Sequence, residues 1–267
     1  MKTHSLLELF KDTNLDSFAP HRLMLDYVAS LATIEDDQLH KRLLEELIHK
    51  YVLLEKRVDS LLKNTLPEAV AEEIKYEGKF SPRSYDCTIL FSDFVGFTRL
   101  AERISGDILI NTLDQIFTQF DRIVNQHKGT KIKTIGDAYM AVFGAPTQLD
   151  DHAVRCVRTA MALIACLDTF NKENALQFQM RIGVHSGKVR AGVVGKERMQ
   201  FDVFGDDVNI ASRFESSGEK GRVNVSENTY LQSRAYFQFE ERGWIDLKNK
   251  GRMKAYFVTR ERQMEYG

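Results

Sequence analysis

Cysteine is scarce in this sequence, and its few copies are not spaced for a metal site or a redox pair. The chain of 267 residues contains three, Cys87, Cys156 and Cys166, whereas zinc sites and dithiol centres use closely spaced cysteine pairs. A sparse and odd count is typical of proteins in a reducing compartment. It argues against a fold held together by disulfides.

Long apolar runs are lacking as well. The longest, residues 160–167, falls far short of the roughly 20 residues that a membrane-spanning helix needs, and it belongs to an amphipathic pattern. The N-terminus carries no apolar block that ends in a small-residue cleavage site. We therefore expect a soluble cytoplasmic protein without a membrane span.

Neither sign of charge dominates the chain. Lys and Arg total 37 against 38 Asp and Glu, which gives a formal net charge of −1. Long-range attraction to nucleic acid or to an anionic membrane is then not what organises the molecule, and we expect no nucleic-acid partner. Hydrophobic residues make up 43 % and charged residues 28 %, which is ordinary for a globular protein with a good-sized core.

Proline and glycine are absent from residues 21–66, where the pattern predicts a long helix. Apolar residues in its second half recur at alternating steps of three and four, which is the spacing of a heptad repeat. These residues are Leu44, Leu47, Tyr51, Leu54, Val58 and Leu61. We expect a short coiled coil over residues 41–66; one long helix packed on its own domain is the alternative. Residues 1–40 predict a helical N-terminal region, broken at Pro20, that could receive a regulator of unknown identity or extend a dimer contact.

The pattern of apolar residues changes at the start of the second part of the chain. Residues 67–83 predict a short helix behind Pro67 and then a linker. From Tyr85 onward, apolar strand-like runs alternate with amphipathic helices. We expect strands at 85–92, 130–143 (a hairpin), 177–185 with a hairpin partner at 188–195, 222–225, 236–247 and 255–259, and helices at 98–127, 150–171 and 207–216.

Three stretches carry side chains suited to phosphate chemistry. The first, residues 88–98, is an apolar strand that ends in Asp93, then a Gly turn and a helix start; carboxylates bind hard cations, and free N–H groups at a helix start bind phosphate. The second, residues 131–140, places Asp137 in a Gly-Asp turn between two strands. The third, residues 200–213, puts Asn209 and Arg213 on one helix face. Taken singly, each has an ordinary explanation as a cap, a turn or a solvated face.

Together these stretches closely resemble the catalytic domain of class III nucleotidyl cyclases. The resemblance runs from about Tyr85 to Val258 and rests on several separated motifs in the family's order. These are the segments Phe91–Phe97, Lys133–Asp137, Met180–Gly187 and Gly205–Arg213. It implies an α+β domain over residues 84–267 with a ferredoxin-like β-α-β-β-α-β core and additions. Residues 61–67 resemble the helical transducer that often precedes this domain.

The resemblance also implies a role for each site residue. Asp93, Asp137 and the backbone carbonyl of Phe94 would hold two divalent cations, Mg²⁺ or Mn²⁺. Asn209 would orient the ribose, and Arg213 would neutralise charge that builds on the α-phosphate in the transition state. The phosphate contacts would come from Arg181, from Lys248 (with Lys250 as the alternative), and from the backbone of Val95, Gly96, Phe97 and Thr98.

The choice of base rests on Lys133 and Asp202. Adenine offers an acceptor at N1 and a donor at N6, which suits a Lys beside an Asp, whereas the family's guanylyl cyclases carry Glu and Cys at these places. The prediction is an adenylate cyclase that converts ATP to 3′,5′-cyclic AMP and pyrophosphate. The alternatives are a guanylate cyclase and a nucleotide-binding module with little turnover.

The family's sites are shared between two subunits, and this chain carries both halves once, so we expect a homodimer with two identical sites. One departure from the family is Asp207, where a Thr is common; its extra negative charge near Asn209 would weaken nucleotide binding. A phosphate-binding P-loop is excluded because Gly195-Lys196 lacks the rest of that motif. No second pair joins His152 and His185 at zinc-ligand spacing, so both histidines are expected to be structural.

Overall fold

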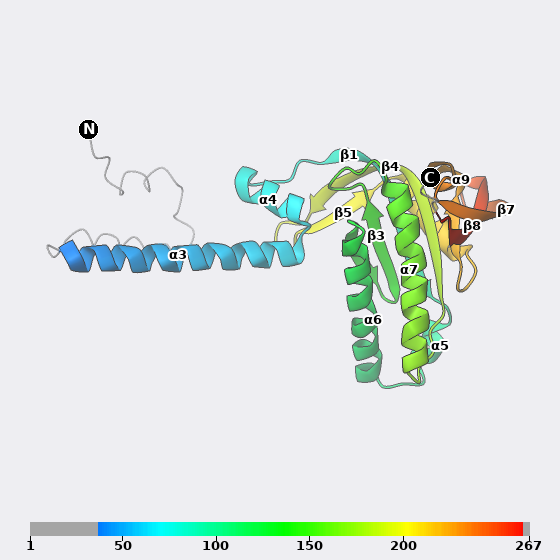
Figure 1. Cartoon of the computed structure of the whole chain (residues 1–267), viewed down its shortest axis with the longest axis horizontal. Helices are drawn as coiled ribbons and strands as arrows, with labels where there is room; N and C mark the ends of the chain where they lie inside the picture. Colours follow the sequence, from blue (N-terminus) through cyan, green and yellow to red (C-terminus); the bar gives the residue numbers. More distant parts are fainter. Residues whose placement is uncertain (1–36, 264–267) are drawn as a thin grey trace. The chain divides into compact units, whose positions relative to one another are not determined.

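The computed structural model describes residues 37–263, so the helices expected before residue 37 lie outside the described residues. The contacts within the chain separate two units, Met1–Leu62 and Lys63–Gly267. All described residues of the first unit belong to helix α3 (Asp37–Thr65; Figure 1). The last three residues of this helix are counted with the second unit. Within residues 37–263, no helix is both long and apolar enough to cross a bilayer.

The long helix expected near residues 41–66 is confirmed by α3. Four of its heptad residues are exposed in the single chain: Tyr51, Leu54, Val58 and Leu61. A row of exposed apolar side chains along one helix face is what a coiled-coil partner would cover. The coiled coil itself stays a prediction.

The second unit is built on one sheet of eight strands in the order β2-β3-β1-β4-β6-β8-β7, with β5 paired to β4. Its elements are α4 (Glu68–Glu77), β1 (Arg83–Phe94), α5 (Phe97–Ala101), α6 (Gly106–Gln126), β2 (Thr130–Ile135), β3 (Ala138–Phe143), α7 (His152–Glu173), β4 (Met180–Val194), β5 (Gln200–Phe204), α8 (Asp206–Ser216), β6 (Val223–Ser226), α9 (Glu227–Ser233), β7 (Phe237–Leu247) and β8 (Gly251–Glu261). The neighbours β2-β3-β1-β4 are mutually antiparallel and are linked through α6 and α7, which confirms the expected β-α-β-β-α-β core.

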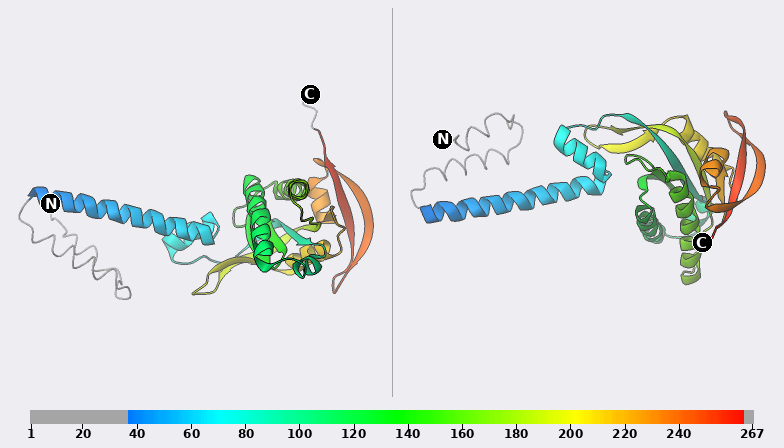
Figure 2. Two further views of the ribbon diagram at one scale, coloured as in Figure 1. Left: turned by 90° about the horizontal axis from the view of Figure 1, so that it is seen from below. Right: turned by 45° about the horizontal axis from the view of Figure 1, so that its top comes forward.

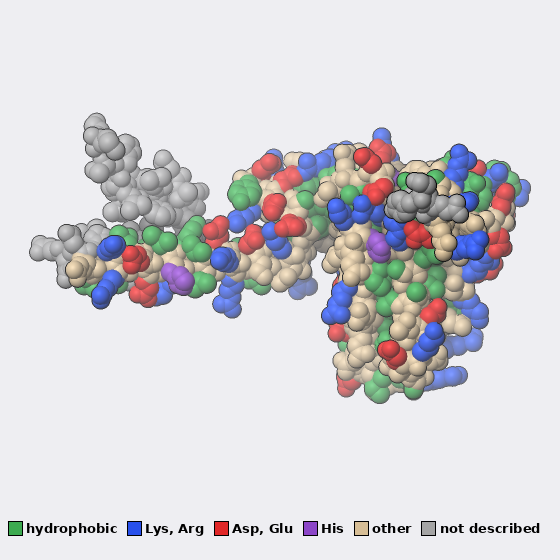
Figure 3. Space-filling model, in the orientation of Figure 1, with side chains coloured by type: hydrophobic (Ala, Val, Ile, Leu, Met, Phe, Trp, Pro, Cys, Tyr) green, Lys and Arg blue, Asp and Glu red, His purple; other side chains and the backbone are tan. Residues whose placement is uncertain are grey.

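Helices cover the two faces of this sheet unequally. The long helices α6 and α7 lie side by side on one face (Figures 1 and 2), where they bury the main core with Leu90, Tyr139 and Val184. The opposite face carries α8, which packs a smaller cluster around Phe214. Charged side chains of both signs are scattered over the surface in Figure 3, in keeping with the near-zero net charge.

Two expectations about secondary structure were wrong, and two elements were missed. The helix expected at 98–127 is divided into α5 and α6, because the Ser105 hydroxyl caps α6 by accepting a hydrogen bond from the Ile108 N–H (3.4 Å). The hairpin expected between 177–185 and 188–195 is one continuous strand, β4, whose antiparallel partner is instead β5. Strand β5 and the short helix α9 were not foreseen.

Side-chain alternation along the central strands positions the site. On β1, Leu90 and Phe94 belong to the core beneath α6 and α7, so Asp93 points to the opposite face, where α8 lies. On β4, Met180 and Ile182 belong to that same core, and Arg181 between them points toward α8. The two central strands therefore place the Asp93 carboxylate and the Arg181 guanidinium side by side on the face that carries α8.

Candidate active site

Asp93 and Arg181 lie directly opposite each other on β1 and β4. The Arg181 guanidinium donates to Asp93 Oδ2 at 2.9 Å and lies 3.1 Å from Glu215 Oε1 on α8. Its Nε atom is buried without a hydrogen-bond partner. Arg181 is thus held between the proposed metal carboxylate and Glu215.

Asp137 lies in the two-residue turn between β2 and β3, and its carboxylate meets that of Asp93. Burial raises the pKa of Asp137, and the neighbouring Asp93 charge and hydrogen bond raise it further, while main-chain hydrogen bonds, one of them from Phe94, lower it. Two carboxylates that repel each other in this way are stabilised by a shared cation. The donor set therefore fits divalent metal.

The remaining ligands of such a cation would not be acidic side chains or histidines. Within residues 37–263, no group of three or more His, Cys, Asp or Glu is arranged to hold a metal ion. Two carboxylates leave coordination positions for a main-chain carbonyl, water and substrate oxygen, which is the pattern that Mg²⁺ favours. The Phe94 carbonyl, next to Asp93 in the chain, is a suitable candidate.

Glu215 is a site residue that the sequence reasoning missed. Its side chain is buried on the face of α8 that touches the sheet, and it reaches Arg181. Burial raises the pKa of Glu215 to about 7, the Arg181 charge opposes this, and Asp93 adds to it. A signal was present in the sequence: Glu215 follows Phe214 and lies four residues after Ala211, so it falls on the apolar face of the helix, where a carboxylate requires a partner.

Glu215 should make the stability of the metal-free protein depend on pH. A carboxyl whose pKa is raised on folding stabilises the fold fully below its unfolded value, near 4.5, and loses that contribution as the pH rises through about 7. With a chelator present, Glu215→Gln should exceed the wild type in unfolding free energy by about 1–3 kcal/mol at pH 8, with a much smaller gain at pH 5. Urea denaturation at both pH values measures this.

The matched control is Glu240→Gln, which neutralises an exposed carboxylate on β7 that pairs with Arg222. It should leave the pH dependence of stability unchanged. Equal stabilities of the wild type and Glu215→Gln at pH 8 would contradict the assignment.

Lys133 and Asp202 come together although β2 and β5 are not neighbours in the sheet. Lys133 Nζ lies 2.5 Å from Asp202 Oδ2, and both side chains are largely shielded from solvent. The other carboxylate oxygen accepts from the Val203 N–H at 2.9 Å, which fixes its orientation. A donor and an acceptor thus lie side by side; that they read the base stays a prediction.

Asn209 and Arg213 lie on α8, away from the sheet. The inner side of this helix is formed by Ile210, Ala211 and Phe214, which are buried, while Asn209 is exposed. Asp93 lies beneath the helix and Asn209 on its outer side, so one chain does not gather the expected set around a single point. This arrangement suits a site completed by a second copy.

The structure separates the two lysines considered for phosphate binding. Lys250 is paired with Asp206 at the start of α8, whereas Lys248 is exposed in the turn between β7 and β8. Lys248 is therefore the better candidate for a phosphate contact.

The segment after Asp93 only partly matches the expected phosphate cradle. The Val95 N–H donates to the Gln179 carbonyl at 2.7 Å, so this amide is occupied, contrary to the expectation. Gly96 adopts a left-handed conformation (φ 74°) that turns the chain into α5. Thr98 lies exposed in the first turn of α5.

The two histidines are structural, as expected. His152 Nδ1 lies 2.6 Å from the Thr88 hydroxyl, and His185 is 1 % exposed, with its ring 2.9 Å from Asp207. Asp207 does not project toward Asn209, because its carboxylate turns back onto His185 and the Lys188 N–H. The expected penalty on nucleotide binding loses its physical basis.

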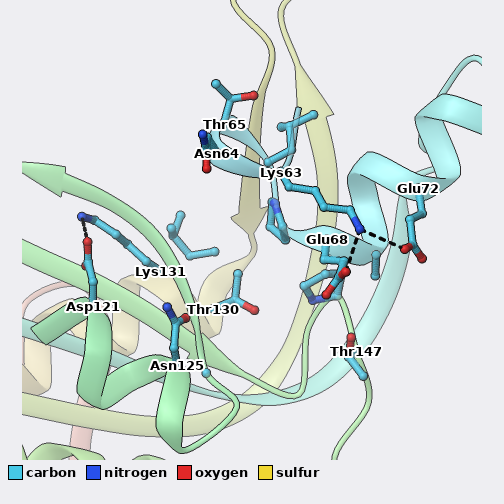
Figure 4. Close-up of a pocket in the computed structure, with 16 residues that line it drawn as sticks. Lys63, Asn64, Thr65, Glu68, Glu72, Asp121, Asn125, Thr130, Lys131 and Thr147 are labelled. Atoms are coloured by element: carbon cyan, nitrogen blue, oxygen red, sulfur yellow. Dashed lines mark hydrogen bonds and ion pairs between the residues drawn. The ribbon is translucent and has the colours of Figure 1, made fainter. Parts of the chain in front are cut away.

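An open pocket of about 760 Å³ lies elsewhere in this unit, among the start of α4, the end of α6 and β2 (Figure 4). Its charged side chains are already paired, Lys63 with Glu68 and Glu72, and Lys131 with Asp121. None of the expected site residues lines it.

The model of the adenylate and guanylate cyclase catalytic domain family matches residues 80–260. The chain belongs to this family of nucleotidyl cyclases. Catalytic domains of this family bind nucleotide, use divalent metal ions and commonly dimerise.

Several named relatives are guanylate cyclases. A receptor-type guanylate cyclase, gcy-28 of Caenorhabditis elegans, is 38 % identical over 84 % of this chain, which spans 18 % of that protein. The human guanylate cyclase soluble subunit beta-2 is 36 % identical over 96 % of this chain and 43 % of its own length. The chain therefore spans less than half of either relative.

Solved structures include cyclases for both nucleotides. The guanylate cyclase domain of RhGC from Catenaria anguillulae, in complex with GTP, is 35 % identical with a TM-score of 0.65 and covers 67 % of this chain and 100 % of its own. The adenylyl cyclase CyaB from P. aeruginosa is 26 % identical with a TM-score of 0.64, over 70 % of this chain and 100 % of its own.

Proposed function

We propose that this chain is an adenylate cyclase that converts ATP to 3′,5′-cyclic AMP and pyrophosphate. The observation that carries the proposal is the pair formed by Lys133 and Asp202, 2.5 Å apart. The Lys ammonium would donate to adenine N1, and the Asp carboxylate would accept from the N6 amino group. Guanine presents the reverse pattern at these positions, so its N1–H donor would face the Lys133 ammonium and its O6 acceptor would face the Asp202 carboxylate.

The proposed reaction requires four contributions from this chain's residues. Asp93, Asp137 and the Phe94 carbonyl would hold two divalent cations, Mg²⁺ or Mn²⁺, which when bound lower the pKa of the ribose 3′-hydroxyl and neutralise the leaving pyrophosphate. Arg181 and Lys248 would bind the outer phosphates. Asn209 would orient the ribose for in-line attack on the α-phosphorus. Arg213 would donate to the oxygens on which charge grows in the transition state.

A homodimer with two shared sites follows from how these groups are distributed. Asp93 lies beneath α8, whereas Asn209 is exposed on the outer side of the helix. In an isologous dimer, the metal-binding half of one copy would face the base-reading half of the other. The exposed apolar side chains of α3 support the same association.

A guanylate cyclase remains the rival, and the named relatives favour it. One solved relative bears directly on the choice: the catalytic core of a rhodopsin-guanylyl cyclase with converted specificity, in complex with ATPαS, is 36 % identical with a TM-score of 0.65. A related guanylyl cyclase scaffold thus accommodates an ATP analogue after its specificity has been converted.

Product analysis tests the proposal. The full chain is incubated with ATP or GTP and with Mg²⁺ or Mn²⁺, and cyclic nucleotide and pyrophosphate are quantified by chromatography. We expect cyclic AMP and pyrophosphate in equal amounts from ATP and far less product from GTP. Preferential formation of cyclic GMP would favour the rival, and no product from either nucleotide would favour a binding module.

A further inference from the structure

A continuous chain of buried hydrogen bonds runs across the sheet to the start of α8. It links, in order, His152, Thr88, Ser186, Thr229, Ser226, His185 and Asp207. The successive distances are 2.6, 2.7, 2.9, 3.2, 2.7 and 2.9 Å. The five members between His152 and Asp207 are at most 1 % exposed, so the network is shielded from solvent.

The Asp207 carboxylate at one end of the network only accepts, and it determines the direction of the neighbouring bonds. In neutral His185, Nε2 carries the proton and donates to Asp207, so Nδ1 accepts from the Ser226 hydroxyl. Burial lowers the pKa of His185, which favours this neutral form, although the Asp207 charge and hydrogen bond oppose it. The network thus ends on a carboxylate that must accept.

Asp207 is fixed at both of its oxygens. Oδ1 accepts from His185 and Oδ2 from the Lys188 N–H at 2.8 Å, so the first turn of α8 is attached to β4 at two points. Gly187 leaves the space that the carboxylate occupies, because a Cβ at that position would lie 2.3 Å from Asp207 Cγ. Asp206, the preceding residue, pairs with Lys250, so the helix start is also tied to the β7–β8 turn that carries Lys248.

Asn209 follows Asp207 by two residues and Arg213 by six, on the same short helix. We propose that Asp207 is a positioning residue: by attaching α8 to His185 and Lys188 on β4, it sets where Asn209 and Arg213 meet the nucleotide. The inference rests on the proposed cyclase roles of those two side chains. It gives a function to a buried network that the chemistry itself does not use.

The test is Asp207→Ala, which removes both attachments and leaves the His185 N–H unpaired. A helix displaced by about 1 Å can cost on the order of 10²-fold in rate, so we expect kcat to fall by about 10- to 100-fold. KM should stay within about threefold, because Lys133 and Asp202 are untouched and the lost contacts act in the transition state. Assays use whichever nucleotide the wild type converts.

Gly187→Ala is the second variant, since it displaces the carboxylate without changing any charge. It should reproduce the loss of kcat. Arg158→Ala is the stability control, because it also removes two side-chain hydrogen bonds between a helix and a strand, from α7 to Glu261 at the end of β8. It should lower the melting temperature but leave kcat unchanged.

Hydrogen exchange provides a readout that is independent of turnover. The amides of α8 should exchange faster in Asp207→Ala and Gly187→Ala, whereas those of α6 and α7 should not. Unchanged exchange in α8, a normal kcat, or a loss of kcat equal to that of Arg158→Ala would each overturn the proposal. If the wild type converted neither ATP nor GTP, the proposed function would fail, and the exchange data would still decide whether Asp207 fixes α8.

Discussion

Asp93→Ala and Arg213→Ala should each abolish cyclase activity, and a mixture of the two inactive variants should regain part of it. Asp93 supplies one of the two carboxylates of the metal pair, so its loss removes a ligand that water cannot replace in charge. Loss of one donor to transition-state charge, as in Arg213→Ala, typically costs about 10²–10³ in kcat. Initial rates of product formation, measured for each variant alone and then after mixing, check both parts.

Recovery is expected because the two substitutions affect opposite halves of a shared site. In a heterodimer, the unaltered Asp93 of one copy would face the unaltered Arg213 of the other, which leaves one intact site and one doubly altered site. Random exchange of subunits makes about half of the dimers heterodimers, so activity should approach about a quarter of the wild-type value.

The matched control mixes Asp93→Ala with Asp137→Ala. Both carboxylates belong to the same half-site, so every heterodimer site would still lack one of them, and no activity should return. Absence of recovery in the first mixture, under conditions where subunits are shown to exchange, would argue for sites contained within one chain.

The local parts of this site could be predicted from the sequence. An apolar run that ends in Asp93, and a Gly-Asp pair between two strand-like runs, are patterns of adjacent residues, and both carboxylates are where those patterns put them. Lys133 and Asp202 are 69 residues apart. Their proximity was inferred from a family resemblance and not from spacing.

The predictions about β4 and Asp207 were wrong because they depend on contacts that sequence spacing does not show. Ser186-Gly187 looked like a turn, yet β4 continues through it, because Gly187 is needed where the Asp207 carboxylate packs against the strand. In the same way, Asp207 looked like a burden on nucleotide binding until His185 and Lys188 were found to hold it. Glycine marks both turns and close approaches, and only the fold distinguishes them.

The second large effect concerns the base. Lys133→Glu combined with Asp202→Cys should move preference from ATP toward GTP. Glu would accept from the N1 and N2 hydrogens of guanine, Cys would donate weakly to O6, and adenine would meet an acceptor where it needs a donor. A site built for one hydrogen-bonding pattern can reject the other by about 10⁴–10⁵, so the ratio of kcat/KM values for the two nucleotides should change by at least about 10²-fold.

Both substitutions are required, because each depends on its partner in the pair. Lys133→Glu alone would set two carboxylates in the place of an ion pair whose atoms are 2.5 Å apart, and it should impair the use of both nucleotides. Asp202→Cys alone would leave a half-buried ammonium without its counter-ion. Lys131→Glu, two residues earlier on β2 and paired with Asp121, is the control: it makes the same charge change on the same strand and should leave base preference unaltered. A double variant that still selects ATP as strongly as the wild type would show that Lys133 and Asp202 do not read the base.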